Sequence, residues 1–154
     1  RRIPPAVGLG ERLEADLRQA LRAGDAVRVS TIRLARAAIK NAEIAKQRPL
    51  SEEEIQDILL GEVKRRREAI EAFERGGRED LSRREALEMA VLTQYLPAPL
   101  SEEELRRIVA EAVAELGATS PAEVGRVMAV VMPRVRRRAE GAVVSRLVRQ
   151  ALGG

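Results

Sequence analysis

Apolar residues recur every three or four positions through almost the whole chain, and proline or glycine marks each interruption. The first example is a leucine at every fourth position from Leu9 to Leu21, a spacing that places all four side chains on one face of a helix. That helix is predicted to end near Gly24, and Asp25 is predicted to cap the next one. Because this spacing continues in the later segments, we predict an all-α protein.

Helix-start signals divide the rest of the chain. In "LSEEEI", Ser51 is expected to accept a hydrogen bond from the backbone while Glu54 reaches back, and Ser101 with Glu104 repeats this capping box. A third box, with proline at the first helical position, is predicted at "TSPAEV", residues 119–124. The acidic first turns are fully explained by capping and by the helix dipole, so we do not interpret them as metal ligands or as an acid/base pair.

The clearest boundary in the chain is "LPAPLS", where Pro97 and Pro99 disfavour helix. We predict an N-terminal four-helix domain at residues 1–97 and a small three-helix domain at residues 98–154. Pro133 is expected to end or kink the second helix of the latter domain. The apolar contacts predicted for the fourth helix of the chain are Leu87, Val91, Leu92 and Tyr95.

Composition limits the chemistry. The chain has no cysteine, histidine or tryptophan, which excludes a disulfide, a zinc–thiolate site, a thiol nucleophile and a histidine base, and we expect no cofactor or metal. Phe73 and Tyr95 are the two aromatic residues, too few and too far apart to form a base-stacking platform. No apolar run is long enough to span a membrane, and the first ten residues lack a secretory apolar core. We therefore expect a cytoplasmic protein.

Positive charge is concentrated near the carboxyl end. Residues 126–149 carry seven arginines and a single acid, Glu140, a net charge of +6 in a chain whose total is +4. The planar fork of arginine suits phosphate oxygens, and a helix start adds unpaired N–H groups. Solvated surface arginine is the alternative, because 25 of the 28 cations in this chain are arginine. The predicted nucleic-acid-binding residues are Arg126, Arg134, Arg136, Arg137, Arg138, Arg146 and Arg149.

A second basic run, "KRRRE" at residues 64–68, is interpreted differently. Four consecutive helical residues point around most of the circumference, so they cannot all face one ligand. Glu62, Glu68 and Glu71 stand at three- and four-residue spacing from these cations. We therefore expect ion pairs on a helix surface here.

Four segments together resemble the YqeY proteins of the GatB/YqeY family, in register from about Leu9 to Leu152. They are "STIRLARAAIKNAEIAK", "RREAIEAFERGGREDL", "YLPAPLSEEEL" and "GRVMAVVMPRVRRRAEGAVVSRLV". The resemblance implies a cytoplasmic bacterial protein with two helical parts. Its C-terminal part would be similar to the tail domain of the B subunit of glutamine-dependent aminoacyl-tRNA amidotransferase, a domain that contacts tRNA.

The chain departs from the family pattern at the arginine run. Family members commonly have glycine and aspartate where this chain has Arg137 and Glu140. If the glycine serves a positive φ angle, Arg137 strains that turn. If it serves close approach of the backbone to a phosphate, the side chain of Arg137 supplies a contact instead.

The leading functional hypothesis is a helical tRNA-binding or tRNA-associated module that grips the phosphate backbone and has no catalytic residues of its own. No nucleophile–base pair, phosphate-cradling glycine loop or metal cluster is visible in the sequence. The alternative is a protein–protein adaptor for an amidotransferase or synthetase. A third hypothesis is an accessory with a direct part in catalysis by the amidotransferase, a carbon–nitrogen ligase with glutamine as amide donor.

Overall fold

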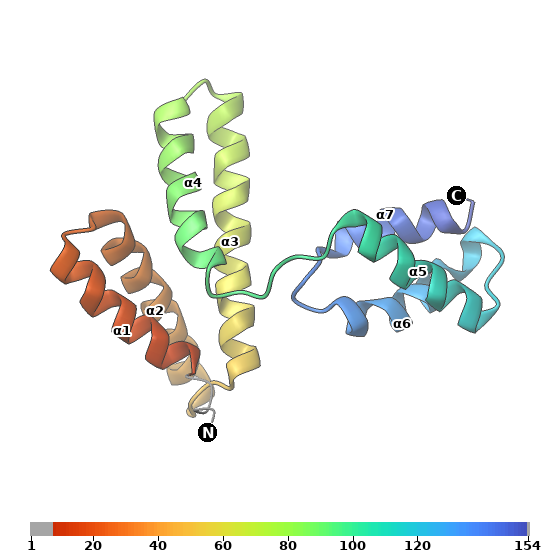
Figure 1. The fold of residues 1–154 in the computed structure, drawn as a ribbon, viewed down its shortest axis with the longest axis horizontal. Helices are drawn as coiled ribbons and strands as arrows, with labels where there is room; N and C mark the ends of the chain where they lie inside the picture. The colour runs from red at the N-terminus through yellow and green to blue at the C-terminus, as the bar shows by residue number, and fades with distance from the viewer. Residues whose placement is uncertain (1–7, 154) are drawn as a thin grey trace, which may run out of the picture. The chain divides into compact units, whose positions relative to one another are not determined.

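The computed structural model describes residues 8–153 of the 154-residue chain. In this part of the chain it contains seven α-helices, one short 3-10 helix and no β-strand, which confirms the predicted all-α fold (Figure 1). The helices fall into two compact units, the first ending at Leu96 and the second beginning at Pro97. Each unit buries its own apolar core.

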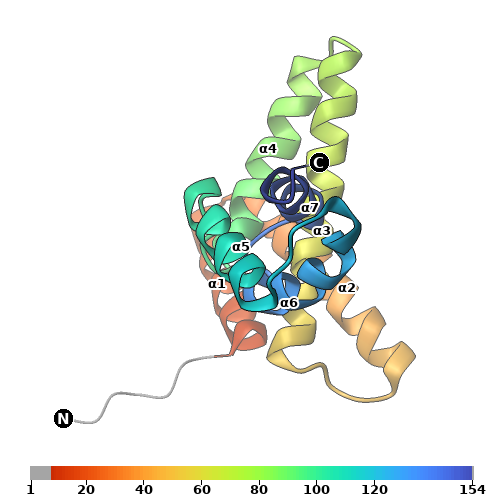
Figure 2. The same ribbon diagram turned by 90° about the vertical axis from the view of Figure 1, so that its right-hand side faces the viewer.

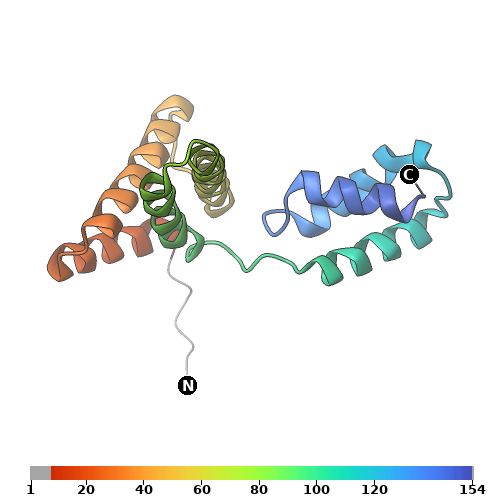
Figure 3. The ribbon, with the colours of Figure 1, turned by 90° about the horizontal axis from the view of Figure 1, so that it is seen from above.

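The first unit consists of two helical hairpins (Figures 1 and 3). One hairpin pairs α1, Leu9–Ala23, with α2, Ala26–Lys46, and the other pairs α3, Glu52–Arg75, with α4, Glu79–Thr93. Helix α2 also contacts both helices of the second hairpin. Large aliphatic side chains from all four helices fill the space between the hairpins, and the fully buried ones are Leu13, Ile32, Leu59 and Leu92.

One leucine predicted as an apolar contact is instead on the surface. Leu87 is 53% exposed, and it lies five residues, about 140° around α4, from the fully buried Leu92. The prediction for Leu87 is therefore wrong. Leu21, the last leucine of the predicted stripe on α1, is also exposed, whereas the three leucines before it are buried.

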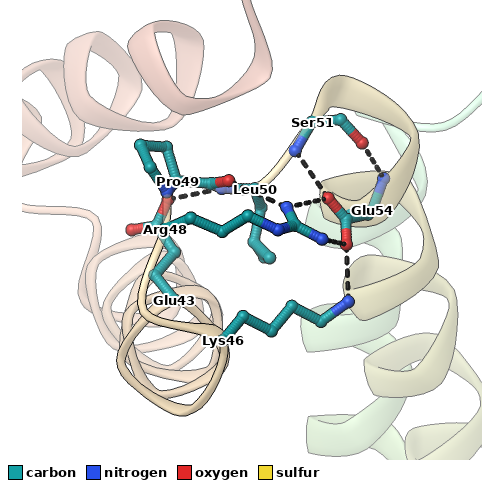
Figure 4. A network of polar contacts seen from close by, with 7 residues as sticks. All are labelled: Glu43, Lys46, Arg48, Pro49, Leu50, Ser51 and Glu54. Carbon is teal, nitrogen blue, oxygen red and sulfur yellow. Dashed lines mark hydrogen bonds and ion pairs between the residues drawn. The ribbon is translucent and has the colours of Figure 1, made fainter.

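A dense polar network closes the turn between α2 and α3 (Figure 4). The guanidinium of Arg48 donates to both carboxylate oxygens of Glu54 at 2.7 and 2.9 Å, and Lys46 Nζ lies 2.5 Å from Glu54 Oε2. Ser51 and Glu54 form the predicted capping box. The hydrogen bond from Arg48, with those from Lys46 and Ser51, holds the pKa of Glu54 well below its ordinary value.

The basic run on α3 does not lie wholly on the surface. Arg66 is buried against α4, where its guanidinium lies 3.2 Å from a carboxylate oxygen of Glu62 and 3.7 Å from one of Glu88. Arg65 remains exposed and pairs with the other oxygen of Glu62 at 3.1 Å. The prediction of surface ion pairs therefore holds for Arg65 and is wrong for Arg66, because Glu88 on α4 supplies a second carboxylate inside the hairpin.

Tyr95, two residues after the end of α4, contacts α1. The Tyr95 hydroxyl donates to the carboxylate of Asp16, and the guanidinium of Arg12 lies 5.0 Å from the centre of the tyrosine ring. Burial, followed by the bond to Asp16, raises the pKa of Tyr95 above its ordinary value. Tyr95 therefore serves the core of this unit, as the sequence predicted.

The second unit is a three-helix arrangement (Figure 2). Helix α5 spans Glu102–Leu116, the 3-10 helix η1 spans Pro121–Glu123, α6 spans Val124–Val135 and α7 spans Gly141–Ala151. Each of the three α-helices contacts the other two. Their core is built largely from valine, and its fully buried members are Val109, Val127, Val131, Val135, Val144 and Val148.

Pro133 lies inside α6 and does not end it, because the helix continues to Val135. A proline removes one hydrogen bond from the helix ladder. Val131 and Val135, on either side of Pro133, are both fully buried. Pro133 was expected to end or kink α6, and the first of these two alternatives is wrong, because the buried valines on both sides keep the last turn packed in the core.

Candidate nucleic-acid interface

The seven predicted arginines all belong to the second unit, at different places along it. Arg126 and Arg134 lie on α6, Arg146 and Arg149 lie on α7, and Arg136, Arg137 and Arg138 are the first three residues of the loop between the two helices, residues 136–140. Arg126 is nine residues before the end of α6, which corresponds to about 14 Å of helix. The structure therefore brings three of the seven together in the loop, at residues 136–138, and this segment is called the arginine loop below.

Three of the remaining arginines are engaged by carboxylates. Arg134 forms a two-pronged pair with Glu115 at 2.6 and 3.3 Å, and Arg146 lies 2.6 Å from Glu102, so each joins its own helix to α5. The bond from Arg134 lowers the pKa of Glu115, and the bond from Arg146 lowers that of Glu102.

The third pair is local, between Arg126 and Glu123 at 3.0 Å. The carboxylate of Glu123 also accepts hydrogen bonds from the main-chain N–H groups of Thr119 and Ser120, at 2.7 and 3.1 Å. These backbone bonds are the main reason that the pKa of Glu123 is lowered. Glu123 thus fixes the start of η1, as predicted for this helix start, and Arg126 adds to that arrangement.

The arginine loop is held in a defined conformation by its main chain. Arg136 is extended, with φ −50° and ψ 132°, and Arg137 has a φ of +66° in the left-handed region. The main-chain N–H of Arg138 donates to Val135 O at 2.9 Å, and its carbonyl accepts from the N–H of Leu100 at 2.8 Å. The side chain of Arg138 adds a bond of 2.9 Å from Nε to Ala98 O.

The positive φ of Arg137 explains why glycine is favoured at this position, and nothing in the structure explains the arginine that replaces it. Side chains with a Cβ are disfavoured in the left-handed region, whereas glycine adopts it readily. The first of the two reasons considered for the family glycine therefore applies here, and Arg137 occupies a strained backbone position.

Two residues separate this loop from helix α7, which begins at Gly141. Its N-cap residue, Glu140, makes no capping hydrogen bond, and no acidic residue occupies the first turn. By contrast, α3 and α5 each begin with a serine cap and three glutamates. The start of α7 therefore has one acid beside it, at the N-cap, where α3 and α5 have three in the first turn.

Beyond the loop, α7 presents a polar outer face. Val144, Leu147 and Val148 are buried, whereas Arg146 and Arg149 are exposed, as their spacing predicted. Among the described residues, Arg136 and Arg149 have no carboxylate partner. These two side chains are the members of the set with the fewest competing contacts.

The described part of the chain holds no group of three or more acidic, histidine or cysteine side chains that could bind a metal. None of its helices is long and apolar enough to cross a membrane. The chemistry that this surface offers is therefore that of guanidinium groups and a helix start, which suit an anionic partner.

Sequence reasoning missed a second basic surface, on α2. Residues 18–40 carry six cations and a single acid, Asp25, whose carboxylate accepts a hydrogen bond from the N–H of Arg28 at the start of α2. Arg33, Arg36 and Lys40 recur at three- and four-residue spacing on the exposed side of the helix. That spacing is visible in the sequence, but the run is less dense than the arginine loop and was not singled out.

Comparison with known proteins identifies the family. The family described as Yqey-like protein matches residues 10–152, nearly the whole described part of the chain. The chain belongs to the YqeY-like family. The predicted resemblance is thereby confirmed, together with a helical YqeY-like domain that includes both units.

Several curated fungal proteins are similar to this YqeY-like chain, all named "Altered inheritance of mitochondria protein 41, mitochondrial". The protein of Eremothecium gossypii is 40% identical over 56% of this chain and 48% of its own length. The protein of Kluyveromyces lactis is 37% identical over 63% of this chain and 55% of its own length. That of Pyrenophora tritici-repentis is 29% identical over 92% of this chain and 80% of its own length. The chain thus spans about half the length of the first two.

The names of these relatives correct one prediction. The YqeY-like chain was expected to be cytoplasmic, whereas all four similar curated proteins are named as mitochondrial. The prediction was drawn from the absence of a secretory apolar core in the first ten residues, a feature that does not separate cytoplasm from mitochondrion. The cytoplasmic assignment is therefore contradicted.

Proposed function

We propose that this protein binds tRNA through the phosphate backbone, with the arginine loop as the primary contact. The observation that carries the proposal is the run of three arginines in a fixed loop that leads, through Ala139 and Glu140, into α7. Guanidinium groups and the first N–H groups of a helix both favour phosphate oxygens. A phosphate bound by the loop would receive the arginine contacts and lie near this helix start.

The neighbouring ion pairs leave room for this binding. The side chains of Arg134 and Arg146 are 39% and 49% exposed in their pairs with Glu115 and Glu102. Exposed pairs of this kind are weak because water screens the two charges, so a phosphate can compete with the carboxylate for such an arginine. Together with Arg149, these arginines extend the surface along both helices. Arg126, at the opposite end of α6, has a supporting part.

The chemistry of the surface favours the backbone over the bases. Sequence-specific binding of single-stranded RNA uses aromatic side chains on which unpaired bases stack. The two aromatic residues of the chain, Phe73 and Tyr95, belong to the first unit, and Tyr95 is buried. Contacts from arginine to phosphate read the shape of the RNA and carry little sequence information.

The resemblance of the second unit to the tail of the amidotransferase B subunit favours tRNA as the particular RNA. The proposed role is binding, and the amidotransferase reaction itself needs catalytic parts beyond the tail. The alternative is an adaptor role, in which the same arginines bind an acidic protein surface. The experiment must distinguish this role from tRNA binding.

The experiment measures tRNA affinity by fluorescence anisotropy at low salt. The test variant combines Arg136→Ala, Arg137→Ala and Arg138→Ala, and the matched control combines Arg75→Ala, Arg83→Ala and Arg84→Ala, which removes the same charge from exposed positions of the first unit. Because the similar curated proteins are named as mitochondrial, a mitochondrial tRNA is included among the probes.

We expect the loop variant to bind roughly 10- to 100-fold more weakly than wild type and the control to lose little, because the lost phosphate contacts are local. Circular dichroism verifies that both variants remain helical. Equal losses of tRNA affinity in the two variants would mean that binding depends on the net charge of the protein and not on the arginine loop. Failure of wild type to bind tRNA at low salt would overturn the proposal and favour the adaptor.

A further inference from the structure

An open apolar groove lies at the closed end of the α1–α2 hairpin, on the first unit. It is lined by Leu21 and Gly24 from the end of α1 and its turn, and by Ala26, Val29, Ser30, Arg33 and Leu34 from the first half of α2. Its lining surface is mainly apolar. The groove lies in the stretch that also carries the second basic surface, residues 18–40.

The two leucines of the groove are unusual in their exposure. Leu21 is 50% exposed and Leu34 is 53% exposed, whereas their neighbours Leu17 and Ala35 are buried. Single exposed leucines are ordinary on protein surfaces, but two that line one groove form a shared apolar site. The α3–α4 hairpin buries the other side of α2 and leaves this side uncovered.

The rim of the groove is cationic. Arg22 follows Leu21 on α1, Arg33 lines the groove itself, and Arg36 and Lys40 continue the exposed face of α2. Within residues 8–153, these four cations form no ion pair. The one acid of the stretch, Asp25, is half-buried and caps α2.

We propose that this groove docks an acidic amphipathic helix of a partner protein. Apolar side chains at three- and four-residue spacing on that helix would cover Leu21 and Leu34. Glutamate or aspartate beside that stripe would meet Arg33 and the cations around it, and this charge complementarity sets the choice of partner. The groove belongs to the first unit and the arginine loop to the second, so the variants that test one site leave the residues of the other unchanged.

The mixture of apolar and basic groups favours a protein helix over other anionic partners. An RNA backbone would engage the cations but leave the two leucines in water, and the groove has no aromatic side chain on which a base could stack. Anionic lipid surfaces bind helices with a broad apolar face, usually with aromatic anchors. Here the apolar groups are confined to a groove between two helices.

The test uses the full chain and a fluorescent synthetic peptide of about 18 residues, five helical turns, with leucines at three- and four-residue spacing flanked by glutamates. One control peptide replaces the glutamates by lysines, and another replaces the leucines by alanines. The protein variants are Leu34→Glu and the pair Arg33→Glu with Lys40→Glu. The matched control is Leu87→Glu, a leucine of the same exposure on α4.

We expect the acidic peptide to bind the wild-type protein. The Leu34→Glu variant and the charge-reversed pair should each weaken this binding about 10-fold or more, whereas Leu87→Glu should change it less than about 2-fold. Both control peptides should bind weakly. All substituted side chains are exposed, and thermal unfolding verifies that the variants fold.

Several results would overturn the proposal. They are absence of binding by the acidic peptide, equal binding of the lysine peptide, and equal loss from Leu87→Glu. A different partner would be indicated if the protein bound no peptide but did bind anionic phospholipid vesicles or RNA, and if Leu34→Glu abolished that binding. The surface would then be assigned to the vesicle or the RNA instead.

Discussion

The Nε–H of Arg138 donates a hydrogen bond of 2.9 Å to the main-chain oxygen of Ala98, forty residues earlier in the chain. Two residues further on, the N–H of Leu100 donates to the carbonyl oxygen of Arg138 at 2.8 Å. These bonds tie the arginine loop to the segment that leads into α5. The main chain of the loop and the side chain of Arg138 are therefore held against the second unit.

Replacing Arg138 by alanine should destabilise the second unit by about 1 kcal/mol, because one hydrogen bond is lost while the main-chain bond from Leu100 remains. Urea unfolding followed by circular dichroism measures the change. Arg136→Ala is the matched control and should fall within about 0.5 kcal/mol of wild type, since Arg136 is exposed and has no carboxylate partner among the described residues. Equal effects from both would contradict the anchoring role of Arg138.

The left-handed backbone at Arg137 predicts an unusual order of stabilities. Arg137→Gly and Arg137→Ala remove the same side-chain contacts, but only glycine is free of strain at a φ of +66°. The glycine variant should therefore be more stable than the alanine variant by about 1 kcal/mol. Equilibrium denaturation of the two proteins measures this difference directly. An alanine variant as stable as the glycine variant would show that the turn is not strained.

The buried cluster between α3 and α4 predicts a large effect at one arginine and a small one at its neighbour. Arg66→Ala leaves the carboxylates of Glu62 and Glu88 close together in a buried site and should destabilise the first unit by about 3 kcal/mol or more. Arg65→Ala removes an arginine whose side chain is 77% exposed and should have almost no effect. Chemical denaturation separates these cases, and similar losses would refute the distinction.

The ion-paired carboxylate of Glu54 should make the folding stability of the first unit depend on pH. Because Arg48, Lys46 and Ser51 lower its pKa in the folded state, its contribution is present above the ordinary glutamate pKa and is lost as pH falls through the lower, folded value. Wild type should therefore lose more stability between neutral and acidic pH than Glu54→Gln does. The measurement is the urea midpoint at each pH. Glu68→Gln, an exposed acid on the same helix, should keep the wild-type pH dependence; matching curves for all three would contradict the network.

The sequence predicts features that are decided locally. The capping box of Ser51 and Glu54 depends on residues three apart, so the pattern alone identifies it. The burial of Arg66 depends on Glu88, on the next helix, and the fixed loop depends on a bond from Arg138 to Ala98. Contacts of this kind are set by how helices pack, which a single sequence does not specify.

The same limit applies to the candidate site. The seven predicted arginines are visible as a charge run, but the carboxylates that engage two of them, Arg134 and Arg146, cannot be identified from the sequence. Glu115 and Glu102 lie on α5, 19 residues before Arg134 and 44 residues before Arg146. Conversely, the exposure of Leu34 beside Arg33 follows from which side of α2 the other hairpin covers. The sequence therefore identifies the charged and apolar side chains of a candidate site, whereas their contact partners depend on how the helices pack.

The dependence of tRNA affinity on salt tests the central claim most directly. If the arginine loop neutralises phosphates, the slope of log K against log salt should be steep for wild type and flatter by about 2–3 for the triple alanine variant at residues 136–138. The control with Arg75, Arg83 and Arg84 replaced by alanine should keep the wild-type slope. An unchanged slope in the loop variant, or no tRNA binding by wild type at low salt, would contradict the account.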